Sequence, residues 1–177
     1  AKMDGWLKVA PRQYTVCEYL SNVYEPAPLD NMAARLRYYM DRGLAGVYAT
    51  YGAPANLRGL WQYVWSEMMW DPRRDPRPIA AEYVSFSYGP AAPGVMEVLD
   101  VYHRRYVETL ATCAEMDGVY PKGYYAGPFV RDVLAAFGRA GNAAGKDAVL
   151  RKEIQTEEIQ FLQDVVELKP RAALDGH

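Results

Sequence analysis

Residues 59–93 read GLWQYVWSEMMWDPRRDPRPIAAEYVSFSYGPAAP, and this stretch predicts two helices with a proline-containing break between them. The first helix is expected to end at Trp70-Asp71-Pro72, because the residue before a proline is pushed out of the α region. Asp75 is placed to cap the second helix, with Pro76 at its first position, where a missing N–H does no harm. Gly89-Pro90 then stops the second helix. Apolar residues recur at helical spacing in both: Leu60, Val64, Met68 and Met69, then Ile79, Ala80, Tyr83 and Val84.

The residues before this stretch predict two strands with a helix between them. Arg12–Val23, RQYTVCEYLSNV, is rich in β-branched and aromatic residues, as strands are. A buried parallel strand is a nearly continuous apolar run, so Glu18 stands out in it. Leu29–Arg42 has a helical apolar face and is followed by Gly43 as a stop, and Leu44–Tyr51 is the second strand. This order predicts a βαβ unit with two parallel strands.

From Ala55 onward the sequence predicts helices and no strand. The expected helices are Ala55–Trp70, Arg77–Tyr88, Ala92–Met116, Pro128–Ala140 and Ala144–Glu167. Asn142 is the expected cap of the last of them. Within it, residues 151–164, RKEIQTEEIQFLQD, are interpreted mostly as a solvated charged face.

Composition excludes some functions and leaves the compartment undecided. The 177 residues make one domain of ordinary size or the end of a larger one. The net charge of −2 argues against nucleic acid as a partner, and no apolar run approaches the roughly 18 residues of a membrane span. The start, AKMDGWLKVAPRQY, lacks the apolar core of a signal peptide and is unlike a native start. We therefore expect a fragment, which would be secreted or periplasmic if the parent chain carries a signal peptide.

No metal or cofactor is expected from the sequence. Cys17 and Cys113 lack metal-ligand spacing and are expected to be buried thiols, while a disulfide between them stays open as an alternative. His103 lies on a charged helix face without a Cys or His at ligand spacing, so it is expected at the surface.

The aromatic content is high, with 15 tyrosines and 4 tryptophans. Tyr and Trp combine a flat apolar face with a polar edge, which suits a sugar ring as well as a protein core. For a single aromatic residue the two interpretations carry equal weight. Trp61, Trp65 and Trp70 recur at helical spacing, so they are expected in the core rather than in a sugar platform.

Residues 12–105, and above all MMWDP followed by IAAEYVSFSYGPAAP, resemble bacterial α-glucuronidase-like glycoside hydrolases. Two groups share the pattern: glycoside hydrolase family 67, and a related family of carbohydrate-associated proteins known only as a domain of unknown function. In both, such a block follows the last strand of a catalytic (β/α)8 barrel. The resemblance implies an α/β fold that becomes all-α, with helices dominant overall. Residues 1–58 would end the barrel, and residues 59–177 would form a C-terminal helical region.

The resemblance also implies a site at the ends of the two strands. The string CEYLSN is similar to the (Q)EYLG segment of family 67, whose Glu acts on the attacking water, so Glu18 would be the general base. Tyr19 and Asn22 would bind the sugar. The loop after the second strand departs from the relatives, in which a polar or acidic residue is expected near the strand end, whereas this sequence has Ala49-Thr50-Tyr51-Gly52-Ala53-Pro54. Tyr51 and Asn56 are the residues there that could line a sugar site by stacking and hydrogen bonding. The general acid would come from an earlier barrel strand. The alternative is that Glu18 is a salt-bridged acid at a strand end.

The function that follows is glycoside hydrolysis by a longer chain, with a carbohydrate substrate and the rest of the parent chain as partner. The alternative is a non-catalytic helical binding or interaction module that retains the scaffold. A third hypothesis is a helical bundle whose two strands pair with a second copy in a homo-oligomer. An enzyme requires Glu18 in a concave site with Tyr19, Asn22 or Tyr51 nearby, whereas a binding module does not.

Overall fold

The computed structural model describes residues 5, 8–9, 15–20, 28–51, 57–112, 116–117, 120–121, 125 and 127–174. Helices dominate, as the sequence predicts. The elements in chain order are β1 (Thr15–Leu20), α2 (Pro28–Asp41), β2 (Gly46–Tyr51), α3 (Arg58–Trp70), α4 (Pro76–Tyr88), a 3-10 turn (Gly89–Ala91), α5 (Ala92–Thr112), β3 (Met116–Asp117), β4 (Tyr120–Pro121), α6 (Gly127–Ala143) and α7 (Ala148–Leu174).

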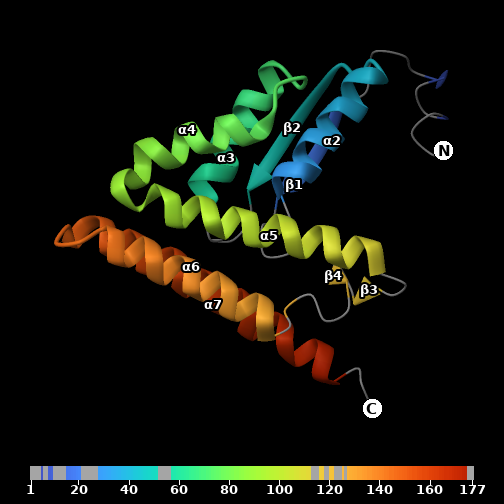
Figure 1. Cartoon of the computed structure of the whole chain (residues 1–177). Helices are drawn as coiled ribbons and strands as arrows, with labels where there is room; N and C mark the ends of the chain where they lie inside the picture. The colour runs from blue at the N-terminus through green and yellow to red at the C-terminus, as the bar shows by residue number, and fades with distance from the viewer. Residues whose placement is uncertain are drawn as a thin grey trace.

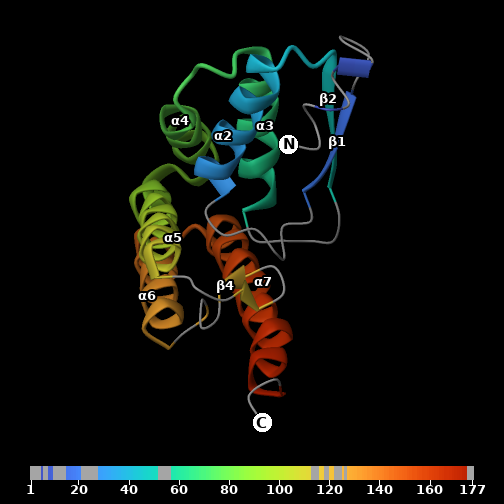
Figure 2. The same ribbon diagram turned by 90° about the vertical axis from the view of Figure 1, so that its right-hand side faces the viewer.

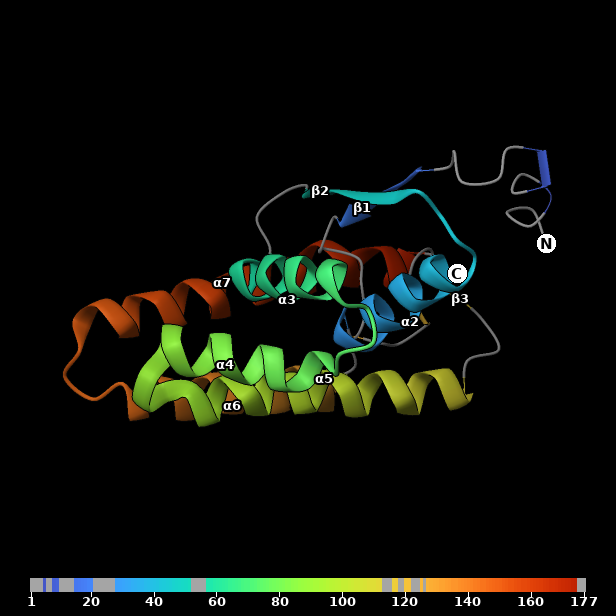
Figure 3. The ribbon, with the colours of Figure 1, turned by 90° about the horizontal axis from the view of Figure 1, so that it is seen from above.

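The elements lie in three layers. Strands β1 and β2 form the first layer, and α2 and α3 cover one of its faces (Figure 2, Figure 3). Helices α4, α5 and α6 lie on the far side of α2 and α3. Helices α6 and α7 run side by side below α5 and are joined by a turn at one end (Figure 1). The sheet is therefore an outer layer of a mainly helical body.

Strands β1 and β2 are parallel neighbours, which confirms the predicted βαβ unit. Their register runs from Thr15 opposite Gly46 to Leu20 opposite Tyr51, with α2 as the crossover between them. The two strands make up the whole of this sheet among the residues that the structure describes. The rest of a (β/α)8 barrel is not seen there, so the barrel remains a proposal.

The core is built from the helical faces that the sequence predicts. Leu60, Val64 and Met68 of α3 are buried together with both Trp61 and Trp65, and the α4 stripe of Ile79, Ala80 and Val84 is buried against them. Trp70 departs from the prediction, because its side chain is 89% exposed. It lies nine positions after Trp61, about two and a half helical turns, and therefore on the opposite side of α3. Met69 is also 41% exposed.

The break between α3 and α4 has the predicted structure. Helix α3 ends at Trp70, and α4 begins with Pro76 as its first residue. The Asp75 carboxylate accepts a hydrogen bond from the Arg77 backbone N–H at 3.0 Å, which is an N-cap contact. Gly89 ends α4 with a φ of 46°, a left-handed value that favours glycine.

The structure corrects three predictions in the C-terminal half. Helix α5 ends at Thr112 rather than at Met116, and β3 and β4 then form a short antiparallel pair in a region where the sequence predicts chain breaks and no strand. Asn142 lies inside α6, and Asp147 caps α7 instead by accepting hydrogen bonds at 3.0 Å from the N–H groups of Val149 and Leu150. Helix α7 also continues beyond Glu167, to Leu174.

Candidate functional site

The carboxyl ends of β1 and β2 bring together the backbones of three predicted site residues. Glu18 is opposite Ala49, Tyr19 is opposite Thr50, and Tyr51 is opposite Leu20. Because successive positions of a strand lie on opposite faces, Glu18 and Tyr19 occupy opposite faces of β1. The structure describes the backbone of Glu18, Tyr19 and Tyr51 but not their side chains.

Asn22 and Asn56, the other two predicted sugar-binding residues, lie outside the described residues altogether. The predicted pairing of the strand ends is therefore confirmed at the level of the backbone. The roles of the five side chains stay predictions.

The sheet has one covered face and one open face. Val16, Val47 and Ala49 are partly buried and pack against the core. Cys17 is exposed on β1, and Tyr48, its register partner on β2, is 55% exposed. The prediction that Cys17 is buried is wrong, because the helices cover only one face of a strand that was expected to be covered on both. Cys17 is a free thiol, and Cys113 lies outside the described residues.

An apolar pocket of about 300 Å³ lies at the other end of β2. It is lined by Leu36, Tyr39, Met40, Leu44, Gly46, Val47, Met69 and Pro72. Gly46 and Val47 are the first residues of β2, whereas the predicted sugar site lies at the end of the strand, near Tyr51. Among the described residues, no acidic side chain lines the pocket, so these residues do not provide the carboxylates that glycoside hydrolysis needs.

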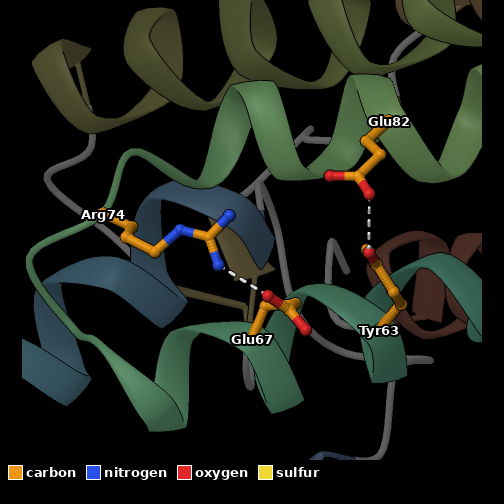
Figure 4. Close-up of polar contacts among 4 residues, drawn as sticks. All are labelled: Tyr63, Glu67, Arg74 and Glu82. Atoms are coloured by element: carbon orange, nitrogen blue, oxygen red, sulfur yellow. Dashed lines mark hydrogen bonds and ion pairs between the residues drawn. The ribbon is translucent and has the colours of Figure 1, made fainter.

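Polar contacts on the surface hold the break between α3 and α4. The Arg37 guanidinium of α2 donates hydrogen bonds of 3.0 Å to the carbonyl oxygens of Pro72 and Arg74. Arg74 in turn pairs with Glu67 of α3 at 2.5 Å (Figure 4). A single side chain from α2 thus contacts the turn that contains the WDP motif at two backbone positions.

A second surface contact joins the middles of α3 and α4. The Tyr63 hydroxyl donates to the Glu82 carboxylate at 3.3 Å, and the two side chains reach toward each other across the helix pair (Figure 4). Loss of solvent, followed by the nearby negative charge of Glu82, raises the pKa of Tyr63 above its ordinary value. Both partners are at the surface, so the contact orients the helices and adds little stability.

The least expected polar cluster involves Glu157 of α7. Its carboxylate accepts hydrogen bonds from the backbone N–H of Leu57, just before α3, and from the Tyr88 hydroxyl at the end of α4, the latter at 3.2 Å. Burial raises the pKa of Glu157, and the two hydrogen bonds act in the opposite direction. Burial also raises the pKa of Tyr88, and the charge of Glu157 adds to this.

The sequence does contain a signal for Glu157. It lies three residues after Ile154 and four before Phe161, both of which are buried, and this is the spacing of one helix face. The prediction of a solvated charged face for residues 151–164 is therefore wrong at this position. The run of charges around Glu157 concealed its place in the apolar stripe.

Two further observations concern metals and membranes. Within the part of the chain that the structure describes, no three His, Cys, Asp or Glu side chains are grouped so as to hold a metal ion. His103 is exposed on α5, as predicted. None of the described helices combines the length and the apolar character that crossing a membrane requires.

Comparison with known proteins gives one family. The model of the family described as Domain of unknown function (DUF4838) matches residues 1–100, from before β1 into α5. No curated protein and no solved structure matches the chain significantly. The predicted resemblance to a domain-of-unknown-function family is thus confirmed, and nothing in the comparisons bears on glycoside hydrolase family 67. Because the match covers more than half of its 177 residues, the chain belongs to the DUF4838 family.

Proposed function

We propose that this chain is part of a glycoside hydrolase of the α-glucuronidase-like type and acts within a longer protein. One observation carries the proposal: β1 and β2 are parallel, joined by α2, and in register up to Leu20 and Tyr51. In α/β barrels the residues that follow the carboxyl ends of parallel strands build the active site. Glu18, two positions before the end of β1, is therefore near the place where a barrel enzyme would carry out its chemistry.

The incomplete cover of the sheet supports a longer protein. Purely parallel sheets are almost always covered on both faces, yet Cys17 and Tyr48 are exposed on the face away from the helices. Both edges of a two-stranded sheet also carry unpaired backbone groups, which favour pairing with further strands. Neighbouring strands of a barrel would pair with these edges, and other parts of a longer protein would cover the open face.

In the proposed reaction, the Glu18 carboxylate accepts a proton from a water molecule that attacks the anomeric carbon of the sugar. A second carboxyl group, from an earlier strand of the parent chain, protonates the leaving oxygen. Inverting enzymes hold the two groups roughly 6.5–9.5 Å apart so that the water fits between them. Tyr19 and Tyr51 would stack on or hydrogen-bond the sugar, and Asn22 and Asn56 would bind its hydroxyl groups.

The test is hydrolysis of glucuronosyl substrates by the full-length protein and by its Glu18→Gln variant. Loss of a general base lowers kcat by about 10²-fold or more, so the variant should be nearly inactive. Tyr19→Phe, at the neighbouring position on the other strand face, should change KM more than kcat. Asp132→Asn, an exposed acid on α6, is the control and should behave as wild type. Unchanged turnover in Glu18→Gln would remove Glu18 from the mechanism.

A non-catalytic interaction module is the second candidate, and the exposed aromatic residues favour it. Trp70 is 89% exposed at the end of α3, and Phe86 is 92% exposed on α4. Aromatic residues of this kind are enriched at the energetic centres of protein interfaces. If the full-length wild type hydrolyses no glucuronoside, and Trp70→Ala or Phe86→Ala weakens self-association measured by sedimentation, the interaction module replaces the hydrolase.

A further inference from the structure

The Glu157 carboxylate joins three elements that are distant in sequence. It lies on α7, and its two acceptor oxygens take hydrogen bonds from Leu57, before α3, and from Tyr88, at the end of α4. Leu57 is fully buried and has a left-handed backbone, with φ 54° and ψ 27°. That conformation is uncommon for a leucine, and it persists only where the surroundings hold it.

Helix α3 depends on an acceptor from outside itself. The first N–H groups of any helix lack partners within the helix, and the N-cap residue Leu57 provides no side-chain hydrogen bond to α3. A carboxylate at this end also faces the positive end of the helix dipole, which offsets part of the cost of burying its negative charge. Glu157 therefore does for α3 what a capping residue ordinarily does, but from another helix.

The place of this contact matters for the proposed site. Leu57 directly follows Asn56, a predicted sugar-binding residue, and it is the first described residue after the carboxyl end of β2 at Tyr51. Glu157 itself lies beyond residues 1–100, the part that matches the family. The C-terminal helices thus reach the start of α3, where it follows the strand end.

We propose that Glu157 is a positioning residue that fixes the backbone at Leu57, the residue that follows the predicted sugar-binding residue Asn56 in the chain. This inference rests on the proposed glycoside hydrolase function. Among the described residues, the ionisable groups that act on the carboxylate are Tyr88 of α4 and Glu153 of α7. Neither of them is a cation, so the contact relies on hydrogen bonding and on the dipole of α3.

The first measurement is amide hydrogen exchange at Leu57 in the full-length protein. Glu157→Ala removes the acceptor, and exchange at Leu57 should accelerate about tenfold or more. Glu157→Gln keeps an oxygen acceptor and should restore exchange to within a few fold of wild type. Glu158→Ala removes the next carboxylate of α7, which has no hydrogen bond to a described residue, and should leave exchange unchanged. If Glu157→Ala does not fold, Glu157→Asp replaces it with the same expected direction.

The second measurement is steady-state hydrolysis of a glucuronosyl substrate by the same variants. Glu157→Ala should raise KM on the order of tenfold with a smaller change in kcat, and Glu157→Gln should rescue it. Unaltered exchange at Leu57 in Glu157→Ala overturns the proposal. Faster exchange with an unaltered KM overturns the link to the site. Faster exchange in a protein whose wild type hydrolyses no glucuronoside overturns the proposed function and supports only the anchoring of Leu57.

Discussion

The backbone N–H of Leu57 donates a hydrogen bond to the side chain of Glu157, 100 positions further along the chain. Of the two, Leu57 lies inside the segment that matches the family and Glu157 lies outside it. Helix α7 is therefore tied to the start of α3 by a specific polar contact.

Glu157 should make stability depend on pH. The pKa of Glu157 is raised in the folded protein. Its contribution to the free energy of unfolding is therefore fully present below the ordinary Glu pKa of about 4.3 and is lost as the pH rises through the folded pKa. The glutamine side chain of the Glu157→Gln variant cannot ionise, so this variant does not lose that stability as the pH rises. Urea unfolding between pH 4 and pH 8 should therefore show a stability advantage of the Gln variant that grows with pH. A constant difference between the two curves would contradict this.

Truncation of Glu157 to alanine should lower the free energy of unfolding at every pH. Glu157→Ala leaves the Leu57 N–H and the Tyr88 hydroxyl without their acceptor, which costs about 1–3 kcal/mol. The midpoint of urea unfolding measures this. The matched Glu158→Ala variant should stay within about 0.5 kcal/mol of wild type.

Gly94 allows α5 to approach α6 closely. A Cβ atom at Gly94 would lie 2.6 Å from the backbone nitrogen of Ala140 and 2.7 Å from its Cα, and neither atom can move away as a flexible side chain would. Gly94→Ala should therefore cost about 1–3 kcal/mol of unfolding free energy. Gly138→Ala in α6 is the control, because its Cβ would meet nothing within 4 Å and should stabilise the helix by up to about 1 kcal/mol. Equal melting temperatures for the two variants would contradict the close approach.

Truncation of two tryptophans of α3 should change the free energy of unfolding by very different amounts. Trp65 is fully buried, and Trp65→Ala should cost about 3–5 kcal/mol. Trp70 is 89% exposed, and Trp70→Ala should change stability by no more than about 0.5 kcal/mol. Thermal unfolding followed by circular dichroism distinguishes them. A large loss at Trp70 would mean that its exposed side chain is covered in the protein in solution.

Two substitutions distinguish Asp147, which caps α7 in the structure, from Asn142, which the sequence predicts as the cap. Asp147→Ala removes the acceptor for the N–H groups of Val149 and Leu150 and should cost about 1 kcal/mol. Asn142→Ala changes an exposed position inside α6 and should be close to neutral. The reverse order in chemical unfolding would restore Asn142 as the cap.

Local signals made the first half of the fold predictable. The proline break after Trp70 and the Asp75 cap determine α3 and α4 through residues next to each other in the chain, and the βαβ order follows from two strand patterns and a helix between them. The β3–β4 pair was missed because each strand has only two residues, which is too short for a period to appear.

Features of the site that depend on contacts between residues distant in the sequence are harder to predict. The exposure of Cys17 depends on which face the helices leave open, and the strand sequence does not contain that information. The role of Glu157 depends on a hydrogen bond to a residue of another element, although its helical spacing from Ile154 and Phe161 marks it as lying on the inner face. The roles of the predicted sugar-binding side chains stay predictions, because the structure does not describe these side chains.

The free thiol of Cys17 has a practical consequence. It lies on the uncovered face of β1, so a maleimide reagent reaches it readily in this chain, and peptide mapping separates its product from that of Cys113. In an intact parent protein with the remaining strands in place, the same sulfur would be shielded. The alkylation rate at this single atom therefore tests the proposed parent protein, because slower alkylation in a longer chain would show that further structure covers the sheet.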